Sequence, residues 1–239
     1  MIEIRRSAER GEANFGWLHA RHSFSFGSYF DPQQVGFSDL LVINDDRIQG
    51  GTGFGMHPHR DMEIFTYILD GALAHQDSMG QSSVIRPGDV QMMSAGTGVR
   101  HSEFNASATE LVHLLQIWIV PDRKGVAPRY HERHFDAADK RGRLCPIIAP
   151  DEAQGALPVY QDVRVYAGLF DGDEAQTFTL ATKRYAYVHV ARGTLELNGQ
   201  RLHAGDGARI RHETALHFSQ GQQAEVLLFD LRPNELPVI

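Results

Sequence analysis

The sequence lacks several features that would point to particular classes of protein. It has a single cysteine, Cys145, so no internal disulfide can form and the composition suits a reducing compartment. No stretch approaches the roughly 18 consecutive apolar residues of a membrane-spanning helix, so we expect no membrane partner. The start, MIEIRRSAERGEANFGW, has no apolar stretch after its charges, so no signal peptide is recognised. These absences predict a cytoplasmic protein in which Cys145 is a bystander rather than a catalytic thiol.

An excess of basic residues is also missing. The formal net charge is −7 and the sequence pI is near 6.0, which argues against direct binding of nucleic acid. What is present is an ordinary globular composition, with 42% hydrophobic residues, that can build a core. The length of 239 residues is comfortable for two domains of about 110 residues each.

A helical period is missing from nearly the whole chain, and short strand-like segments take its place. The dipeptide Asn198-Gly199 suits a type I′ hairpin turn. The pattern predicts an all-β barrel or sandwich, with weak helix candidates only near 135–141 and 151–154. The strand-like runs end in glycine, asparagine or aspartate turns and include DLLVIND (39–45), EIFTYILDG (63–71), VQMMSAG (90–96), ELVHLLQIWIV (110–120), YAYVHVARG (185–193), TLELNG (194–199) and AEVLLFDL (224–231).

The two halves of the chain follow the same plan, which indicates an internal repeat of a β module. Residues 67–102 read as strand, glycine turn, strand, PGD turn, strand, and then a glycine loop that ends in a histidine. Residues 188–219 repeat this order, with AGD in place of PGD and His217 near the position of His101.

A change of composition separates the two repeats. Residues 136–158 are richer in charge, proline and alanine than the segments on either side. We therefore expect an N-terminal domain over 1–135, a linker over 136–158 and a C-terminal domain over 159–239.

The most polar part of this pattern is GFGMHPHRDMEIFTY, residues 53–67. Side chains alternate faces along a strand, so His57 and His59 share one face, and the same parity continues through Asp61 and Glu63. An H-x-H pair by itself is weak evidence of metal binding, because it also arises by chance.

A second pair, His101 and Glu103 in GTGVRHSEF, has the same spacing. If adjacent strands inside a barrel bring this pair to His57 and His59, three imidazoles and a carboxylate converge. Such a set suits a first-row divalent metal with one or two open positions, and a barrel supplies the dry pocket in which a metal polarises a substrate. The second half has no H-x-H at the matching place, QTFTLATK, and His217 has no partners nearby, so we expect no metal there.

The spacing G-x5-H-x-H-x3-E, followed by PGD…G…H, resembles the two cupin motifs. More narrowly, HSFSFGSYFDP, FGMHPHRDMEIFTYILDG, HQDSMG and SAGTGVRHSE resemble the pirin family of bicupins, most densely over residues 17–135. The overall similarity is to bacterial pirin-like proteins with quercetin 2,3-dioxygenase activity. The resemblance implies an all-β fold of two cupin barrels in tandem, each a double-stranded β-helix or jelly roll, with a degenerate C-terminal barrel.

The resemblance also implies a ligand set. Cupins in general take their carboxylate from the first motif, which would be Glu63, whereas pirins take it from the second. We therefore favour Glu103, with Glu63 either a pocket group or hydrogen-bonded to a nearby strand end or to Arg60. The family implies iron as Fe²⁺, and zinc, nickel, copper and manganese are also compatible with this set. The implied metal ligands are His57, His59, His101 and Glu103.

The function implied by the resemblance is a dioxygenase that opens the ring of a flavonol such as quercetin with O2 and releases carbon monoxide. Glu103 is the expected catalytic base for the flavonol 3-hydroxyl, because burial in an apolar barrel raises the pKa of a carboxylate. Two other functions stay open. One is a metal- or redox-responsive regulator that binds a protein partner, as pirins also do. The other is a small-molecule-binding cupin whose metal is purely structural.

Overall fold

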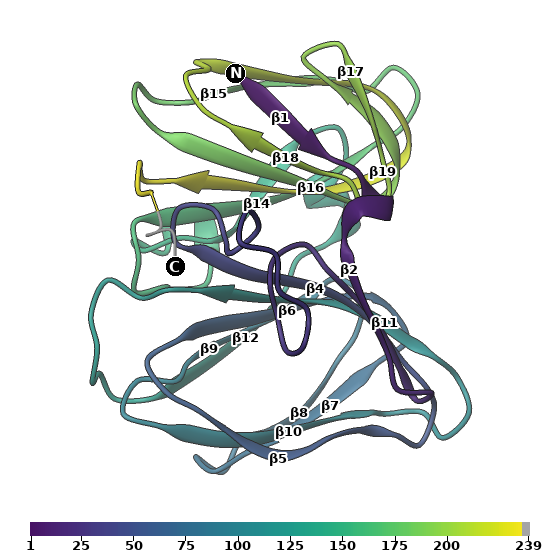
Figure 1. Ribbon diagram of the computed structural model, residues 1–239, viewed down its shortest axis with the longest axis vertical. Helices are drawn as coiled ribbons and strands as arrows, with labels where there is room; N and C mark the ends of the chain where they lie inside the picture. The colour runs from purple at the N-terminus through teal and green to yellow at the C-terminus, as the bar shows by residue number, and fades with distance from the viewer. Residues whose placement is uncertain (236–239) are drawn as a thin grey trace. The chain divides into compact units, whose positions relative to one another are not determined.

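Strands and turns make up almost all of the structure, a computed structural model that describes residues 1–235 (Figure 1). The prediction of an all-β chain is confirmed, and the paired strands are antiparallel throughout this range. Helical structure in the described chain is limited to α1 (Ala137–Lys140) and two 3-10 turns, η1 (Ser7–Glu9) and η2 (Ala153–Gly155). None of the described helices is long and apolar enough to cross a membrane.

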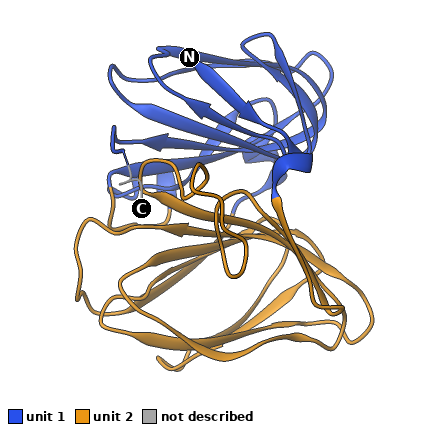
Figure 2. Ribbon diagram, viewed as in Figure 1, with its two compact units in different colours: residues 1–10, 135–156, 162–237 blue, residues 11–134, 157–161, 238–239 orange. Residues whose placement is uncertain are grey.

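The chain forms two compact units, shown in blue and orange in Figure 2. Among the described residues, unit 1 comprises 1–10, 135–156 and 162–235, and unit 2 comprises 11–134 and 157–161. The domain boundaries expected from the sequence remain a prediction, because closeness in the folded chain does not show which segments fold independently.

Unit 2 is built from two antiparallel sheets, which Figure 1 shows as separate layers. The strand order is β12-β9-β6-β11-β4-β3-β2 in the seven-stranded sheet and β5-β10-β7-β8 in the four-stranded sheet. The strands are β2 (Gly11–Asn14), β3 (Leu18–His22), β4 (Leu40–Ile48), β5 (Gly53–His59), β6 (Glu63–Asp70), β7 (Leu73–Asp77), β8 (Ser82–Ile85), β9 (Asp89–Ser94), β10 (Val99–Asn105), β11 (Val112–Ile119) and β12 (Arg129–His134).

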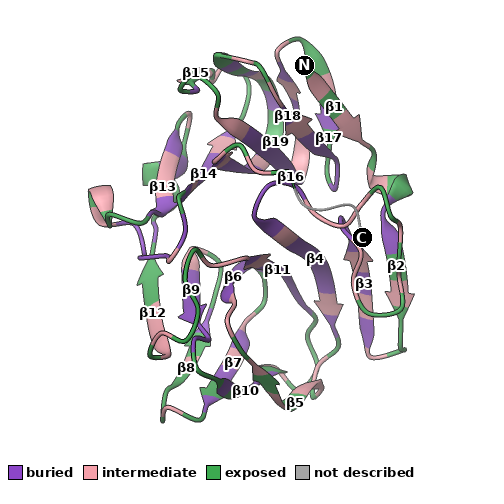
Figure 3. Cartoon of the chain, turned by 60° about the vertical axis from the view of Figure 1, so that its left-hand side comes forward, coloured by how far each residue is buried: buried purple, intermediate pink, exposed green. Residues whose placement is uncertain are grey.

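Burial along these strands shows what the two sheets enclose (Figure 3). In β3 and β7 every second residue is buried, so one face of each strand points into the unit. The side chains of Leu18, Ile48, Ile68, Leu73 and Leu114 form an apolar cluster there. Burial of one such side chain contributes about 1.5–3 kcal/mol. Nearly all of β6 and β11 is buried on both faces, which explains why their sequences read as continuous apolar runs.

Unit 1 is one eight-stranded sheet with the order β1-β18-β16-β19-β14-β13, to which β15 adds on β19 and β17 on β16. Asn198 and Gly199, between β16 and β17, have φ of 48° and 77°. Because a type I′ turn needs positive φ at both positions, the hairpin prediction is confirmed. The strands are β1 (Ile2–Arg5), β13 (Leu144–Ile148), β14 (Val163–Phe170), β15 (Gln176–Thr179), β16 (Tyr185–Leu197), β17 (Gln200–His203), β18 (Gly207–Ile210) and β19 (Ala215–Leu231).

Candidate metal centre

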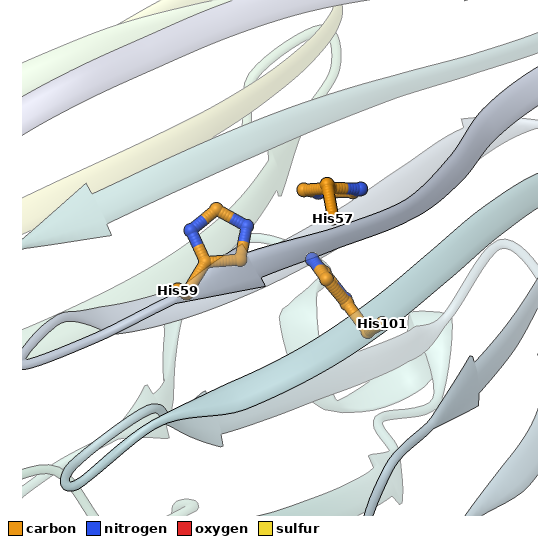
Figure 4. A group of neighbouring side chains, drawn as sticks. All are labelled: His57, His59 and His101. Atoms are coloured by element: carbon orange, nitrogen blue, oxygen red, sulfur yellow. The ribbon is translucent and has the colours of Figure 1, made fainter.

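The two histidine motifs lie on neighbouring strands of the four-stranded sheet. His57 and His59 are in β5 and His101 is in β10, and the antiparallel register sets His57 directly opposite His101. The register shifts between His101 and Glu103, so β5 has one extra residue at this bulge. Figure 4 shows the three imidazole rings, two from one strand and one from the next, around a common space.

The three imidazoles are close enough to share one ion. One ring nitrogen from each of His57, His59 and His101 lies within 4.8 Å of the other two. The ring centroids are 4.4 Å apart for His57 and His101, 4.8 Å for His59 and His101, and 4.9 Å for His57 and His59. The structure therefore brings together the three histidines that the sequence places on two separate segments.

The hydrogen bonding of these rings fits a metal. Among the described residues, both nitrogens of His101 and Nε2 of His59 are buried without a hydrogen-bond partner. Buried polar atoms in proteins are nearly always paired, so atoms like these mark a place for a ligand. His57 Nδ1 lies 2.8 Å from the carbonyl oxygen of Gly55. Because a carbonyl only accepts, Nδ1 holds the proton, and Nε2 presents its lone pair to the cluster.

Burial keeps His59 and His101 in the neutral form that a metal binds. Removal from water, together with the neighbouring imidazoles of His57, His59 and His75, lowers the pKa of His101 to about 2. Burial and the proximity of His57 lower the pKa of His59 to about 4. A neutral imidazole is the ligating form, so the site is ready for a cation at neutral pH.

Glu103 lies inside the barrel next to His101. Its Oε2 is 3.9 Å from His101 Nε2 and accepts a hydrogen bond of 2.9 Å from Gln116 Nε2. Its Oε1 has no partner among the described residues. Burial raises the pKa of Glu103 to about 7, although hydrogen bonds from Gln116 and Thr66 oppose this. A carboxylate oxygen of Glu103 and one ring nitrogen from each of His101 and His75 all lie within 4.8 Å of one another. Glu103 does not form such a group with all three predicted histidine ligands at once.

His75 is a site residue that the sequence reasoning missed. Its signal is the pair His75-x-Asp77, which has the same two-residue spacing as the other motifs. Both ring nitrogens are engaged, Nε2 with Asp77 Oδ2 at 3.1 Å and Nδ1 with Gln91 Nε2 at 3.0 Å. The ring packs 5.3 Å from that of His101. His75 therefore supports His101 and, with both nitrogens occupied, is not placed to ligate.

The parity argument is wrong beyond residue 59. Strand β5 ends at His59, and the chain turns through Asp61, whose φ is 47°, before β6 begins at Glu63. Residues separated by a turn do not share a strand face. The carboxylate of Glu63 accepts hydrogen bonds from Ser94 Oγ at 2.9 Å and from the backbone N–H of Tyr160 at 3.1 Å. Glu63 thus has the structural role of a hydrogen-bonded group at a strand end.

A cavity of about 260 Å³ opens beside the histidine cluster. The ring of Trp118 stands edge-to-face 5.0 Å from that of His59, and Phe26 lies 5.4 Å from Trp118. A slot with aromatic walls and a polar end suits a planar aromatic molecule that carries oxygen atoms. Its apolar lining is Ala13, Phe15, Leu18, Ala20, Phe26, Phe54 and Trp118, and its polar lining includes His22, Asn44, Asp46, His57, His59, Glu103 and Gln116.

In unit 1 the counterpart of His101 lies in a different setting. His217 is exposed in β19, and its Nδ1 is 3.0 Å from the hydroxyl of Thr177. Both groups of side chains that could hold a metal in the described part of the chain are in unit 2.

An all-β chain with three converging imidazoles and a buried glutamate beside one of them defines a metal-binding cupin. The chain belongs to the pirin family: the pirin model matches residues 3–119, and a model for the quercetinase C-terminal cupin domain matches residues 146–231. The prediction of two cupin domains in tandem is thereby confirmed.

Relatives match along their whole length. The chain is 47% identical to the quercetin 2,3-dioxygenase of Escherichia coli (strain K12), covering 98% of this chain and 100% of that protein. It is 41% identical to a pirin-like protein of Caulobacter vibrioides, covering 96% and 99% respectively. The crystal structure of YhhW from Escherichia coli superposes with a TM-score of 0.94 at 46% identity over 99% of this chain and all of that one. A structure of the bacterial pirin YhhW in complex with nickel(II) gives 0.93 at 45% identity over 98% and 100%.

Proposed function

We propose that this chain is a metal-dependent dioxygenase that opens the flavonol ring with O2 and releases carbon monoxide, the quercetin 2,3-dioxygenase reaction. The observation that carries the proposal is the set of unpartnered imidazole nitrogens beside a cavity with aromatic walls. The name of the Escherichia coli relative, a quercetin 2,3-dioxygenase, supports the same reaction. The proposed metal ligands are His57, His59, His101 and Glu103.

The proposed metal is Fe²⁺. The set of nitrogen and carboxylate ligands also accepts zinc, nickel, copper and manganese, and the nickel(II) complex of the bacterial pirin YhhW supports a divalent ion at this kind of site. When bound, such an ion would supply a Lewis acid that polarises the oxygen atoms of the substrate.

The chain's own residues bind the substrate and move its proton. Trp118, Phe54 and Phe26 line the slot and would hold the flat ring system away from water. Glu103 would take the proton of the flavonol 3-hydroxyl on Oε1, the oxygen without a partner, while Gln116 holds Oε2 in place. In the metal-free protein burial raises the pKa of this carboxyl group to about 7, which favours its taking up a proton. The deprotonated, electron-rich ring then reacts with O2.

The test measures quercetin loss and carbon monoxide release, with and without O2, for the wild-type protein and His101→Ala. His217→Ala is a matched control, because His217 is an exposed histidine in unit 1. We expect oxygen-dependent turnover with one carbon monoxide per quercetin in the wild type and the control, and loss of both in His101→Ala. Equal turnover by all three proteins would remove the histidine cluster from the reaction.

A second candidate function is binding of a protein partner in a metal-dependent way. Met56 and Phe104 are exposed apolar residues, and each is the sequence neighbour of a proposed ligand, His57 or Glu103. A metal that fixes the ligands would also fix these outward-facing neighbours. Efficient turnover of a flavonol at micromolar concentration favours the enzyme, whereas negligible turnover together with metal-dependent capture of a partner, abolished by Phe104→Ser, favours the regulator.

A further inference from the structure

Asp46 occupies a position in the sheet at which the paired residues are apolar. In the register of the seven-stranded sheet Asp46 pairs with Ala20 of β3 and with Leu114 of β11, and Leu114 pairs in turn with Ile68 of β6. These four residues form a row across four strands, and the other three, Ala20, Leu114 and Ile68, are buried members of one apolar cluster. Asp46 is only 3% exposed, so its carboxyl group lies in the barrel wall among hydrocarbon side chains.

One carboxyl oxygen of Asp46 has no hydrogen-bond partner among the described residues. Its Oδ1 is buried without a hydrogen bond to any described residue, and no lysine or arginine is among the described residues that line the cavity. Two other polar groups of the cavity have hydrogen bonds: Asn44 Oδ1 is 2.7 Å from His22 Nδ1, and Glu103 Oε2 accepts from Gln116 Nε2. Burial, with the negative charges of Asp45 and Glu103, raises the pKa of Asp46 to about 8.

A buried carboxyl group without a hydrogen-bond partner lowers the stability of a fold. Where such a group lines a binding cavity, a bound ligand can supply the missing hydrogen bond. Asp46 and Glu103 line the same cavity as His57 and His59. A ligand that fills this cavity can therefore contact the histidine cluster and Asp46 at once.

We propose that Asp46 determines substrate specificity: its Oδ1 accepts a hydrogen bond from a ring hydroxyl of the flavonol, a hydroxyl other than the one at the metal end. The inference rests on the proposed function. It holds for both protonation states of the group, because an ionised and a neutral carboxyl each have an oxygen that accepts a hydrogen bond. The substrate class it selects is a polyhydroxylated flavonol rather than 3-hydroxyflavone, which has no other hydroxyl.

The experiment compares quercetin with 3-hydroxyflavone in the metal-loaded wild type, Asp46→Leu and Asp46→Asn. Binding is followed without O2 by quenching of tryptophan fluorescence, since Trp118 lines the cavity, and turnover is followed in air. We expect the wild type to prefer quercetin by about 10-fold or more in Kd and in kcat/KM, since a lost hydrogen bond to a buried polar group has an effect of that order. Asp46→Leu should lose most of this preference, so that the ratios of Kd and of kcat/KM for the two flavonols fall toward one. Asp46→Asn, which keeps a carbonyl acceptor, should retain it.

Thermal unfolding separates recognition from a structural role. If Asp46 serves the ligand, Asp46→Leu should unfold at the same or a higher temperature than the wild type, because leucine completes the apolar row. A preference for quercetin that survives in Asp46→Leu would overturn the inference and leave the proposed function intact. A wild type that binds both flavonols equally would also overturn it, whether or not the variants fold. If quercetin binds without being cleaved, the proposed function fails, and the ratio of Kd values still decides the role of Asp46.

Discussion

Units 1 and 2 both enclose a β core, but they bury different kinds of side chain. In unit 1 the buried cluster is formed by aliphatic and aromatic residues such as Val188, Val226, Leu228 and Phe218. In unit 2 the apolar cluster shares the barrel with buried His101, Glu103, Asp46, Gln116 and His75. Unit 1 buries fewer polar side chains, His189 and Asp206 among them, and both groups of possible metal ligands in the described residues lie in unit 2.

The buried polar groups of unit 2 therefore point to function. An apolar interior is favoured by burial alone, whereas a buried polar group without a hydrogen bond costs roughly 1–3 kcal/mol in proteins. Unit 2 keeps such atoms on His101, His59, Glu103 and Asp46. A bound metal and a bound substrate would satisfy them, so unit 2 is the one whose stability and activity should respond to ligands.

The largest expected effect comes from His101→Ala. Loss of a central imidazole should remove the metal and lower kcat/KM for quercetin by about 100-fold or more, since changes at metal sites commonly have effects of 10- to 100-fold even when they act indirectly. His217→Ala, the corresponding change in unit 1, should leave both values unchanged. Comparable losses in the two variants would contradict the assignment of the metal site to unit 2 alone.

Leu228→Ala tests the opposite side of the comparison. Leu228 is fully buried in the apolar cluster of unit 1, and its truncation should lower the free energy of unfolding by about 2–5 kcal/mol. Calorimetry and metal analysis of the folded fraction provide the measurement. Metal content per folded chain should stay at the wild-type value, and a proportional loss of metal would show that unit 1 takes part in the site.

Removal of the metal should lower stability without unfolding the chain. A ligand present at 100 times its Kd stabilises the native state by about 2.7 kcal/mol, so chelation should lower the unfolding temperature by the matching amount. Circular dichroism should still report a β fold after chelation, because the apolar clusters of both units remain. Complete unfolding would instead favour a purely structural metal.

A smaller effect is expected from Glu103→Gln in the metal-free protein. Burial raises the pKa of Glu103 from 4.5 to about 7, so the native state holds its proton more tightly than the unfolded state does. The stability that this contributes is fully present below about pH 4.5 and is lost as the pH rises through about 7. Relative to the wild type, the variant should gain about 1–3 kcal/mol between pH 4.5 and 7.5, measured by urea denaturation. A constant difference across this range would contradict the raised pKa.

Local patterns in the sequence predicted much of the site. Two-residue alternation was enough to place His57 with His59, and the strand pairing of β5 with β10 then set His101 opposite His57. The same alternation failed at Glu63, because the turn at Asp61 and a hydrogen bond from Tyr160, 97 residues away, decide its role.

Contacts between distant strands account for what the sequence could not show. His75 has the same spacing to Asp77 as the histidine motifs have internally, but its partner Gln91 lies on another strand. Asp46 is conspicuous only when Ala20 and Leu114 are seen beside it. Such rows are formed by strands that are distant in the sequence, and the pattern within one strand does not show which residue of another strand lies opposite.

The most direct test of the central claim is an anomalous-scattering map from crystals of the protein loaded with one divalent metal. We predict a single strong peak in unit 2, at about 2.0–2.2 Å from a nitrogen of each of His57, His59 and His101 and from an oxygen of Glu103. A peak at His217 or elsewhere in unit 1, with none among these imidazoles, would contradict the account.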